Sequence, residues 1–213
     1  MNIITRKGLL DSNTYLVEFK DKYFFVDASY SFFKFKEEFP SVSLMDEDNT
    51  VVLITHAHID HIFEIESYSA NAIPFDIVIH KDEEDKLMDS YKNCSSAILN
   101  KNMNFPFAIA AAKSFEDIEP IEGLSMFHTP GHSEGSCCYM FDDGNNKALF
   151  TGDTLFKYSI GRTDLPGGDY AQMNESISLL KSIYEQYGDM DVYPGHGPAT
   201  TLMMEIKHNP YFR

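Results

Sequence analysis

The chain has 213 residues, a length that accommodates a single domain with a sizeable hydrophobic core. Hydrophobic residues make up 43% of the sequence and charged residues 23%, as in ordinary globular proteins, and the formal net charge is −16. This acidity argues against a nucleic acid as partner, because affinity for a phosphate backbone depends on Lys and Arg.

Alternating apolar positions and turn residues divide the first half of the chain into short elements. The predicted strands are Asn2–Thr5, Asn13–Phe19, Tyr23–Asp27, Val51–Thr55 and Ile77–His80. The predicted helices are Tyr30–Phe39, which should end at Pro40, then Asp60–Ala70 and the polar segment Lys81–Asn100. Residues Asn102–Glu119 fit neither pattern, and we expect a loop there that covers the functional site.

The second half of the chain repeats this mixture of strands and helices. The predicted strands are Met126–Thr129, Cys137–Phe141, Ala148–Thr151 and Asp191–Tyr193. The predicted helices are Asp169–Gln186 and Ala199–Lys207. Because the sequence has no linker, repeat or low-complexity segment, residues 1–213 are predicted to form one α/β domain.

The cysteines and the apolar runs indicate the cellular compartment of the protein. Cys94, Cys137 and Cys138 form an odd set without a disulfide framework, which favours a reducing cytoplasm. The N-terminal segment lacks the layout of a signal peptide, and no apolar run approaches the ~20 residues of a membrane span. We therefore expect a cytoplasmic protein without a membrane partner, and the adjacent Cys137 and Cys138 are predicted to be core residues.

The most informative motif is THAHIDH at residues 55–61, directly after an apolar run. In an extended chain alternate side chains point the same way, so His56 and His58 share one side. Asp60 and His61 fall on the bend that follows, where Asp60 could alternatively cap a helix. Four nitrogen and oxygen donors in six positions predict a site for more than one cation.

Three further donors follow predicted strands, each beside a glycine. They are His132 in TPGHS, Asp153 in TGDT and His196 in PGHG. Glycine permits tight turns and close backbone approach. A single histidine in a Pro-Gly turn is usually a surface residue, and a Gly-Asp pair is usually a turn or a helix cap. All seven donors at strand ends nevertheless favour a metal site.

The motifs HxHxDH, TPGHS, TGDTLF and PGHGPATT together resemble the metallo-β-lactamase superfamily and, within it, the glyoxalase II-like hydrolases. The resemblance runs from about residue 13 to the C-terminus. It implies an αββα sandwich, with two mixed β-sheets face to face and helices outside. It also implies a ligand set: His56, His58 and His132 at one metal, Asp60, His61 and His196 at the other, and Asp153 bridging both.

The same resemblance implies the chemistry. Two divalent metal ions, most commonly zinc with iron or manganese as alternatives, would share a hydroxide that attacks the carbonyl of a small-molecule substrate. Asp60 and Asp153 are the implied catalytic carboxylates. A thiolate leaves readily because its pKa is near 8.5, so the expected substrate is a thioester like S-lactoylglutathione or a related ester. Asp27, at the end of an early strand, could orient a metal-binding histidine or simply form a turn.

The segment that begins Gly161-Arg162-Thr163-Asp164 resembles that of compact bacterial glyoxalase II-like proteins. Arg162 stands where longer glyoxalase II enzymes have a glutathione-contacting Lys, and Asp164 where they have a Tyr. Arg162 is therefore the predicted substrate-binding residue, with a salt bridge to Asp164 as the alternative. The longer enzymes also grip glutathione with a C-terminal helical domain. This sequence ends at Arg213, so we expect tolerance of changes in the thiol half of the substrate.

Two other activities occur in proteins of similar sequence. Persulfide dioxygenases share the Gly-Arg-Thr-Asp segment and use one iron, whose ligands correspond to His56, His132 and Asp153. This is the main alternative to hydrolysis. Di-iron electron-transfer proteins usually have a carboxylate where His58 stands, together with a flavin domain, so they fit this sequence less well. His80, His128 and His208 are predicted to have structural roles.

Overall fold

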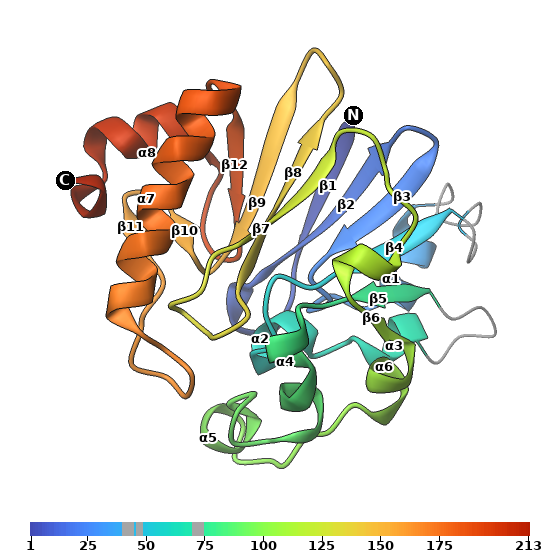
Figure 1. Ribbon diagram of the computed structural model, residues 1–213. Helices are drawn as coiled ribbons and strands as arrows, with labels where there is room; N and C mark the ends of the chain where they lie inside the picture. The colour runs from blue at the N-terminus through green and yellow to red at the C-terminus, as the bar shows by residue number, and fades with distance from the viewer. Residues whose placement is uncertain (40–44, 46–48, 70–74) are drawn as a thin grey trace. The chain divides into compact units, whose positions relative to one another are not determined.

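The computed structural model describes residues 1–39, 45, 49–69 and 75–213. The chain divides into two units, Met1–Glu119 and Pro120–Arg213, each of which contains one mixed β-sheet (Figure 1). The predicted fold class, two mixed sheets flanked by helices, is confirmed. The single domain predicted for residues 1–213 stays a prediction.

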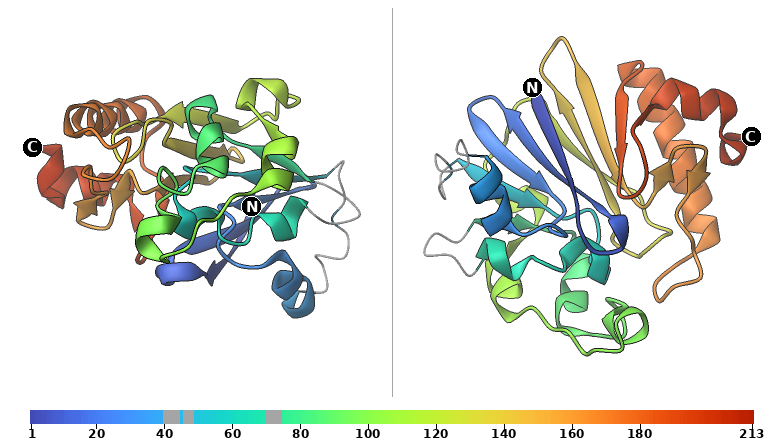
Figure 2. Two further views of the ribbon diagram at one scale, coloured as in Figure 1. Left: turned by 90° about the horizontal axis from the view of Figure 1, so that it is seen from below. Right: turned by 180° about the vertical axis from the view of Figure 1, so that it is seen from behind.

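The sheet of the first unit combines an antiparallel and a parallel half. Its strands, in spatial order, are β1 (Asn2–Lys7), β2 (Asn13–Phe19), β3 (Lys22–Val26), β4 (Thr50–Leu53), β5 (Asp76–Val78) and β6 (Ala112–Lys113). The first three pair antiparallel, and Figure 2 shows them side by side. The pairings from β3 to β6 are parallel. The carboxyl ends of β3 and β4 therefore lie at one edge of the sheet, where Asp27 and residues 55–61 follow.

Short helices and an aromatic cluster cover one face of this sheet. The helices and 3₁₀ turns are η1 (Leu9–Asp11), α1 (Phe32–Glu38), α2 (Ile59–Ile62), α3 (Glu66–Ser69), α4 (Lys81–Glu84), η3 (Asp85–Met88), α5 (Ser95–Ile98), α6 (Pro106–Ala111) and η4 (Phe115–Asp117). The ring of Phe25, on β3, lies 5.9 Å from Phe32, 5.2 Å from Phe35 and 4.9 Å from Tyr68. Each fully buried Phe contributes about 1.5–3 kcal/mol, so this cluster anchors α1 and α3 to the sheet.

The sheet of the second unit has the spatial order β13 (Thr200–Thr201), β12 (Asp191–Pro194), β9 (Lys147–Gly152), β8 (Cys137–Asp142) and β7 (Leu124–His128). Only the pairing of β12 with β9 is parallel among these described strands. A small hairpin, β10 (Leu155–Phe156) with β11 (Ser159–Ile160), follows β9. Three strands of this unit end close to a predicted metal ligand. Asp153 directly follows β9, His196 lies two residues after β12, and His132 lies four residues after β7.

The helices of the second unit are α7 (Tyr170–Tyr187), α8 (Leu202–His208) and the 3₁₀ turn η5 (Pro210–Phe212). Asp169 caps the start of helix α7, because its side chain accepts from the amides of Ala171 and Gln172. Gly188, with a φ of 80°, follows the last helical residue. Its buried residues recur at helical spacing and pack against one face of the sheet: Met173, Ile177, Leu180 and Ile183.

One buried carboxylate joins α8 to the hairpin. Glu205 accepts hydrogen bonds from the amide of Tyr158 at 2.7 Å, from Thr200 Oγ1 at 2.7 Å and from Asn209 Nδ2 at 2.9 Å. Asn209 Nδ2 also donates to the carbonyl of Ser159 at 3.0 Å. Because Glu205 is fully buried, these donors provide the partners that a carboxylate in the interior requires.

Several predicted elements differ from the structure. The continuous helix at Lys81–Asn100 is wrong, because α4 passes directly into the 3₁₀ turn η3, a turn separates η3 from α5, and Cys94 has a φ of 65°. The loop at Asn102–Glu119 is wrong, because it contains α6, the edge strand β6 and η4. The helix Asp60–Ala70 is split into α2 and α3. Ala70 and Pro40 lie outside the described residues.

The remaining strands and helices agree with the prediction to within a few residues, except that Ala199–Lys207 begins with β13 before α8. In the part of the chain that the structure describes, no helix combines the length and the apolar character that a membrane span needs.

Candidate metal centre

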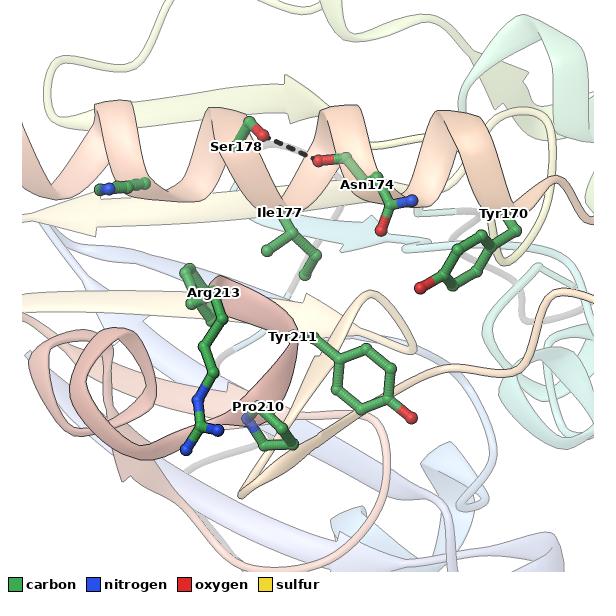
Figure 3. A pocket seen from close by; sticks show the side chains of 9 residues that line it. Tyr170, Asn174, Ile177, Ser178, Pro210, Tyr211 and Arg213 are labelled. Carbon is green, nitrogen blue, oxygen red and sulfur yellow. Dashed lines mark hydrogen bonds between the residues drawn. The ribbon is translucent and has the colours of Figure 1, made fainter.

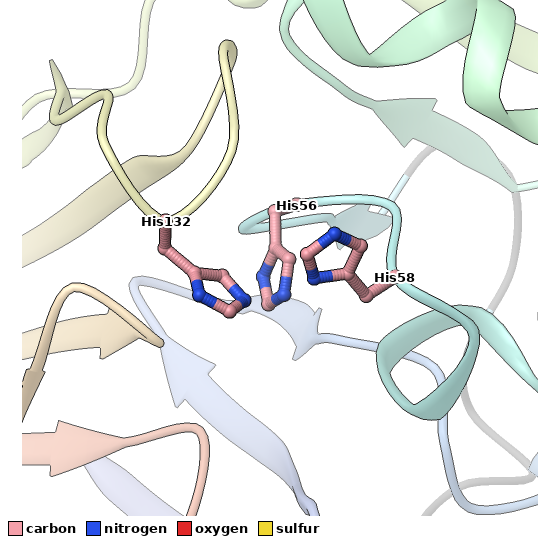
Figure 4. Close-up of side chains that lie close together, drawn as sticks. All are labelled: His56, His58 and His132. Carbon is pink, nitrogen blue, oxygen red and sulfur yellow. The ribbon is translucent and has the colours of Figure 1, made fainter. Parts of the chain in front are cut away.

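Four predicted ligands lie together in the first unit. His56 and His58 are on the loop between β4 and α2, as Figure 4 shows, and their rings are 4.8 Å apart. Asp60 and His61 belong to α2. The ring of His61 lies 4.1 Å from that of His56, and its Nε2 lies 3.8 Å from Asp60 Oδ2. All four residues are buried, so the strand end and the short helix bring the whole THAHIDH donor set into one cluster.

Asp27 orients one of these histidines. Its Oδ2 lies 2.8 Å from Nδ1 of His61, and its Oδ1 accepts from the amide of Thr55 at 2.8 Å. Thr55 Oγ1 also donates to this carboxylate. When Nδ1–H of a neutral imidazole donates to a carboxylate, Nε2 carries the lone pair and becomes the more basic ligand atom. The orienting role considered for Asp27 is therefore supported by its contacts.

The three other predicted ligands lie together in the second unit. His132 follows β7 on the loop labelled in Figure 4, Asp153 follows β9, and His196 follows β12. The same carboxylate oxygen, Asp153 Oδ2, lies 3.5 Å from Nε2 of His132 and 3.7 Å from Nε2 of His196. One carboxylate is thus flanked by two imidazole nitrogens.

The spacing and chemistry of these donors fit divalent metal ions. The nitrogen-to-oxygen separations of 3.5 Å, 3.7 Å and 3.8 Å exceed an ordinary hydrogen bond. Two ligands that are each about 2.1 Å from a tetrahedral cation lie about 3.4 Å apart. Imidazole and carboxylate groups together suit zinc, iron or manganese. Each unit therefore contains a donor cluster that a metal ion could occupy, and the joint ligation of two ions by all seven residues stays a prediction.

The Gly161-Arg162 segment contacts His132 and passes close to the backbone of Asp153. Nδ1 of His132 lies 2.8 Å from the carbonyl oxygen of Arg162, which leaves Nε2 as the ligand nitrogen. A Cβ atom at position 161 would lie 1.9 Å from the carbonyl oxygen of Asp153 and 3.1 Å from Nδ1 of His132. Only glycine permits this approach. The sequence indicated Arg162 through its side chain, whereas the role of its carbonyl had no sequence signal.

The side chain of Arg162 forms the salt bridge that was the alternative to substrate binding. Its Nε and Nη2 lie 2.6 Å and 2.7 Å from the two carboxylate oxygens of Asp164. This bidentate bond lowers the pKa of Asp164 to about 2. Both side chains are exposed, at 63% and 69%, so the pair lies at the surface of its unit. Substrate binding by Arg162 stays a prediction.

The cysteines of β8 are core residues, as predicted. Cys137 and Cys138 are buried, and Cys138 packs among the apolar residues beneath α7. Burial raises the pKa of the Cys138 thiol to about 11, so it is protonated at neutral pH. A protonated thiol is a poor nucleophile, which argues against a catalytic role.

Two histidines outside the predicted ligand set make local contacts. His80 Nδ1 accepts from the amide of Asp82 and caps α4, and His128 Nε2 lies 2.9 Å from the carbonyl oxygen of Glu134. These contacts agree with the structural roles predicted for them.

A cavity of about 710 Å³ lies between α7 and η5 in the second unit (Figure 3). Its lining includes Tyr170, Asn174, Lys181 and Tyr211, all of which are exposed. None of the seven predicted ligands lines it, so this cavity is separate from the predicted metal centre.

Comparison with known proteins gives the family. The model of the metallo-beta-lactamase superfamily matches residues 8–196. The chain is 32% identical over 191 residues to the probable metallo-hydrolase MJ0888 of Methanocaldococcus jannaschii, which covers 87% of each protein. Among solved structures, the BLEG-1 B3 metallo-beta-lactamase matches with a TM-score of 0.80 and 29% identity over 99% of both chains. TTHA1623 in a di-iron-bound form matches with a TM-score of 0.76 and 29% identity over 99% of this chain and all of that one. The chain belongs to the metallo-beta-lactamase superfamily.

Proposed function

We propose that this protein is a glyoxalase II-like metal-dependent hydrolase that cleaves a small thioester or a related ester. The family match and the relative named as a probable metallo-hydrolase support hydrolysis as the reaction class. Seven donors in the two units would hold two divalent ions, and zinc is the proposed metal. These donors are His56, His58, Asp60, His61, His132, Asp153 and His196.

The observation that carries the proposal is the position of Asp153 between two histidines. Its Oδ2 is nearly equidistant from Nε2 of His132 and Nε2 of His196. A carboxylate oxygen with an imidazole on each side suits a ligand shared by two metal ions, each of which takes one of the imidazoles. When bound, such ions lower the pKa of a water ligand to about 7 and polarise a substrate carbonyl.

The residues of the chain prepare the donors for this chemistry. Asp27 and the carbonyl of Arg162 hold Nδ1 of His61 and of His132, so that each presents a deprotonated Nε2. Two divalent ions bring four positive charges, and Asp60 with Asp153 offsets two of them. The proposed centre is thus locally positive in an acidic protein, which favours a substrate that develops negative charge during cleavage.

A thioester is the proposed substrate class because its thiolate leaves without full protonation. Arg162 is the proposed contact for a substrate carboxylate, which would compete with Asp164 for the guanidinium group.

The first test is elemental analysis combined with a substrate panel. Protein purified without chelator should contain close to two equivalents of zinc, iron or manganese per chain. It should hydrolyse S-lactoylglutathione or simpler thioesters, and dialysis against a chelator should abolish turnover until metal is restored. Metal-loaded protein that cleaves no thioester or ester in the panel would contradict the proposed reaction.

Iron-dependent persulfide oxidation is the second candidate, because the segment Gly161-Arg162-Thr163-Asp164 resembles that of persulfide dioxygenases. A 29% identical structure of the same fold is described as di-iron-bound, which supports iron as a metal for this fold. This reaction would use a single iron held by His56, His132 and Asp153. Glutathione persulfide should then cause oxygen uptake, and elemental analysis should give one equivalent of iron. The absence of oxygen uptake by iron-loaded protein would exclude this candidate.

A further inference from the structure

The loop that carries His56 and His58 is held by a buried carboxylate outside the predicted ligand set. Glu83, in α4, is fully buried, and its Oε2 accepts a hydrogen bond from the amide of Ala57 at 2.7 Å. Ala57 is the residue between His56 and His58. The bond therefore acts on the backbone that sets the spacing of two predicted metal ligands.

Lys86 supplies the positive charge that compensates the buried carboxylate of Glu83. Its Nζ lies 2.6 Å from Oε1 of Glu83, and the two side chains are 1% and 0% exposed. One carboxylate oxygen thus contacts Lys86 while the other contacts Ala57. A buried ion pair is commonly no more stabilising than a well-packed apolar pair of similar volume. The position of the Glu83–Lys86 pair is better explained by its contact with the Ala57 amide than by a contribution to the stability of the fold.

The same part of the chain holds the loop at a second amide. The carbonyl oxygen of Asn93 accepts from the amide of Ile59 at 2.8 Å, and Asn93 Nδ2 donates to the carbonyl oxygen of Lys86 at 2.9 Å. The amides on both sides of His58 are consequently bonded to residues 83–93. This leaves the backbone around His58 with fixed partners on both sides.

We infer that Glu83 is a positioning residue for His56 and His58, that Lys86 is its counter-charge, and that Glu83 raises metal affinity through the Ala57 amide. The metal part of this inference rests on the proposed function, whereas the contact with Ala57 does not. Groups that orient metal ligands typically change metal affinity by about 10–100-fold when they are removed.

Two double variants separate the hydrogen bond from the ion pair. Both Glu83→Gln/Lys86→Met and Glu83→Met/Lys86→Met remove both charges, so neither leaves a buried charge alone. The Gln side chain keeps an oxygen that can accept from the Ala57 amide, and the Met side chain does not. Glu83→Leu/Lys86→Met provides a second apolar pair if the methionine pair does not fold. Asp85→Asn is the matched surface control, because Asp85 is an exposed neighbour that pairs with Lys92.

The measurements are amide hydrogen exchange in metal-free protein and zinc affinity by competition with a chromogenic chelator. The apolar pair should speed exchange at Ala57 at least tenfold relative to the Gln variant, while Ile59 changes little because its partner is Asn93. Zinc affinity should fall about 10–100-fold in the apolar pair and stay within about threefold in the Gln variant and in Asp85→Asn.

Equal Ala57 exchange in the two kinds of double variant would overturn the contact. Faster exchange with unchanged zinc affinity would overturn the positioning role. A wild-type protein that binds no zinc, iron or manganese would contradict the proposed function, and the Ala57 exchange rates would still decide whether Glu83 holds the loop.

Discussion

Asp27 and His61 form a buried pair in which a carboxylate at the end of β3 contacts Nδ1 of an imidazole in α2 at 2.8 Å. The backbone of Asp27 has a φ of 60°, a conformation that Asp and Asn tolerate better than most residues. The same carboxylate accepts from the amide of Thr55, so one side chain links the strand end, the start of the THAHIDH segment and the predicted ligand His61.

Asp27→Asn is expected to lower zinc affinity by about 10–100-fold with little loss of fold. Asn can adopt the same backbone conformation and can still accept one hydrogen bond, but it lacks the negative charge that makes His61 more basic. Chelator competition measures the effect. Asp21→Asn is the matched control, because Asp21 is exposed and has a φ of 61°. Equal affinities of the two variants would show that the Asp27 charge is unimportant.

Asp153→Ala is expected to abolish turnover and to reduce the bound metal to well below two equivalents, because a shared ligand would serve both ions. Cys138→Ala should keep kcat/KM within about twofold and cost about 1 kcal/mol of stability as an ordinary core substitution. Metal analysis and steady-state kinetics test both variants. A folded, metal-loaded Cys138→Ala protein without activity would show that the thiol takes part in the reaction.

The Cys138 thiol predicts how stability changes at alkaline pH. Burial raises its pKa to about 11 in the folded state, whereas the unfolded chain should ionise near the usual value of 9.0. The folded protein therefore holds the proton more tightly, so this contribution is complete below about pH 9 and is lost as pH rises towards about 11. Urea unfolding at pH 8 and pH 10.5 measures it. Cys138→Ala should lose less stability than wild type over that interval, and an identical loss would refute the assignment.

Arg162→Ala is expected to raise KM for a carboxylate-bearing thioester by about tenfold while kcat changes less, as for loss of a charge-assisted substrate contact. The Arg162 carbonyl remains available to His132, so the substitution spares that ligand. Asp164→Ala is the companion variant, because it frees the guanidinium group and should leave KM unchanged or lower it. If both variants raise KM equally, Arg162 acts through the salt bridge and not through the substrate.

Most strands could be predicted because their signals are local. Alternating apolar positions place β2 at Asn13–Phe19, and a capping Asp169 with a terminal Gly188 sets the limits of α7. The errors arose where distant contacts decide the structure. The two residues of β6 form a strand because they pair with β5. The helical pattern after His80 is interrupted where the side chain of Asn93 bonds to the carbonyls of Lys86 and Met103 and to the amide of Ser95.

The candidate ligands could be predicted from the sequence because metal chemistry requires particular side chains in particular turns. The groups that orient these side chains could not be predicted. Glu83 is one of many acidic residues in an acidic chain, and nothing local shows that it is buried beside Lys86. Every residue has a backbone carbonyl, so the sequence does not distinguish the one of Arg162, and only the fold reveals that it contacts His132.

Glu205 has a consequence for transplanting loops between members of the superfamily. The residues between Asp153 and Arg162 look like an exchangeable surface hairpin, yet the amide of Tyr158 and the carbonyl of Ser159 are bonded to Glu205 and Asn209, some fifty positions later. A graft of this hairpin from a relative would need the donor's own final helix with it. Otherwise the recipient would retain a buried carboxylate whose hydrogen-bond donors have moved, close in sequence to the Arg162 carbonyl that contacts His132.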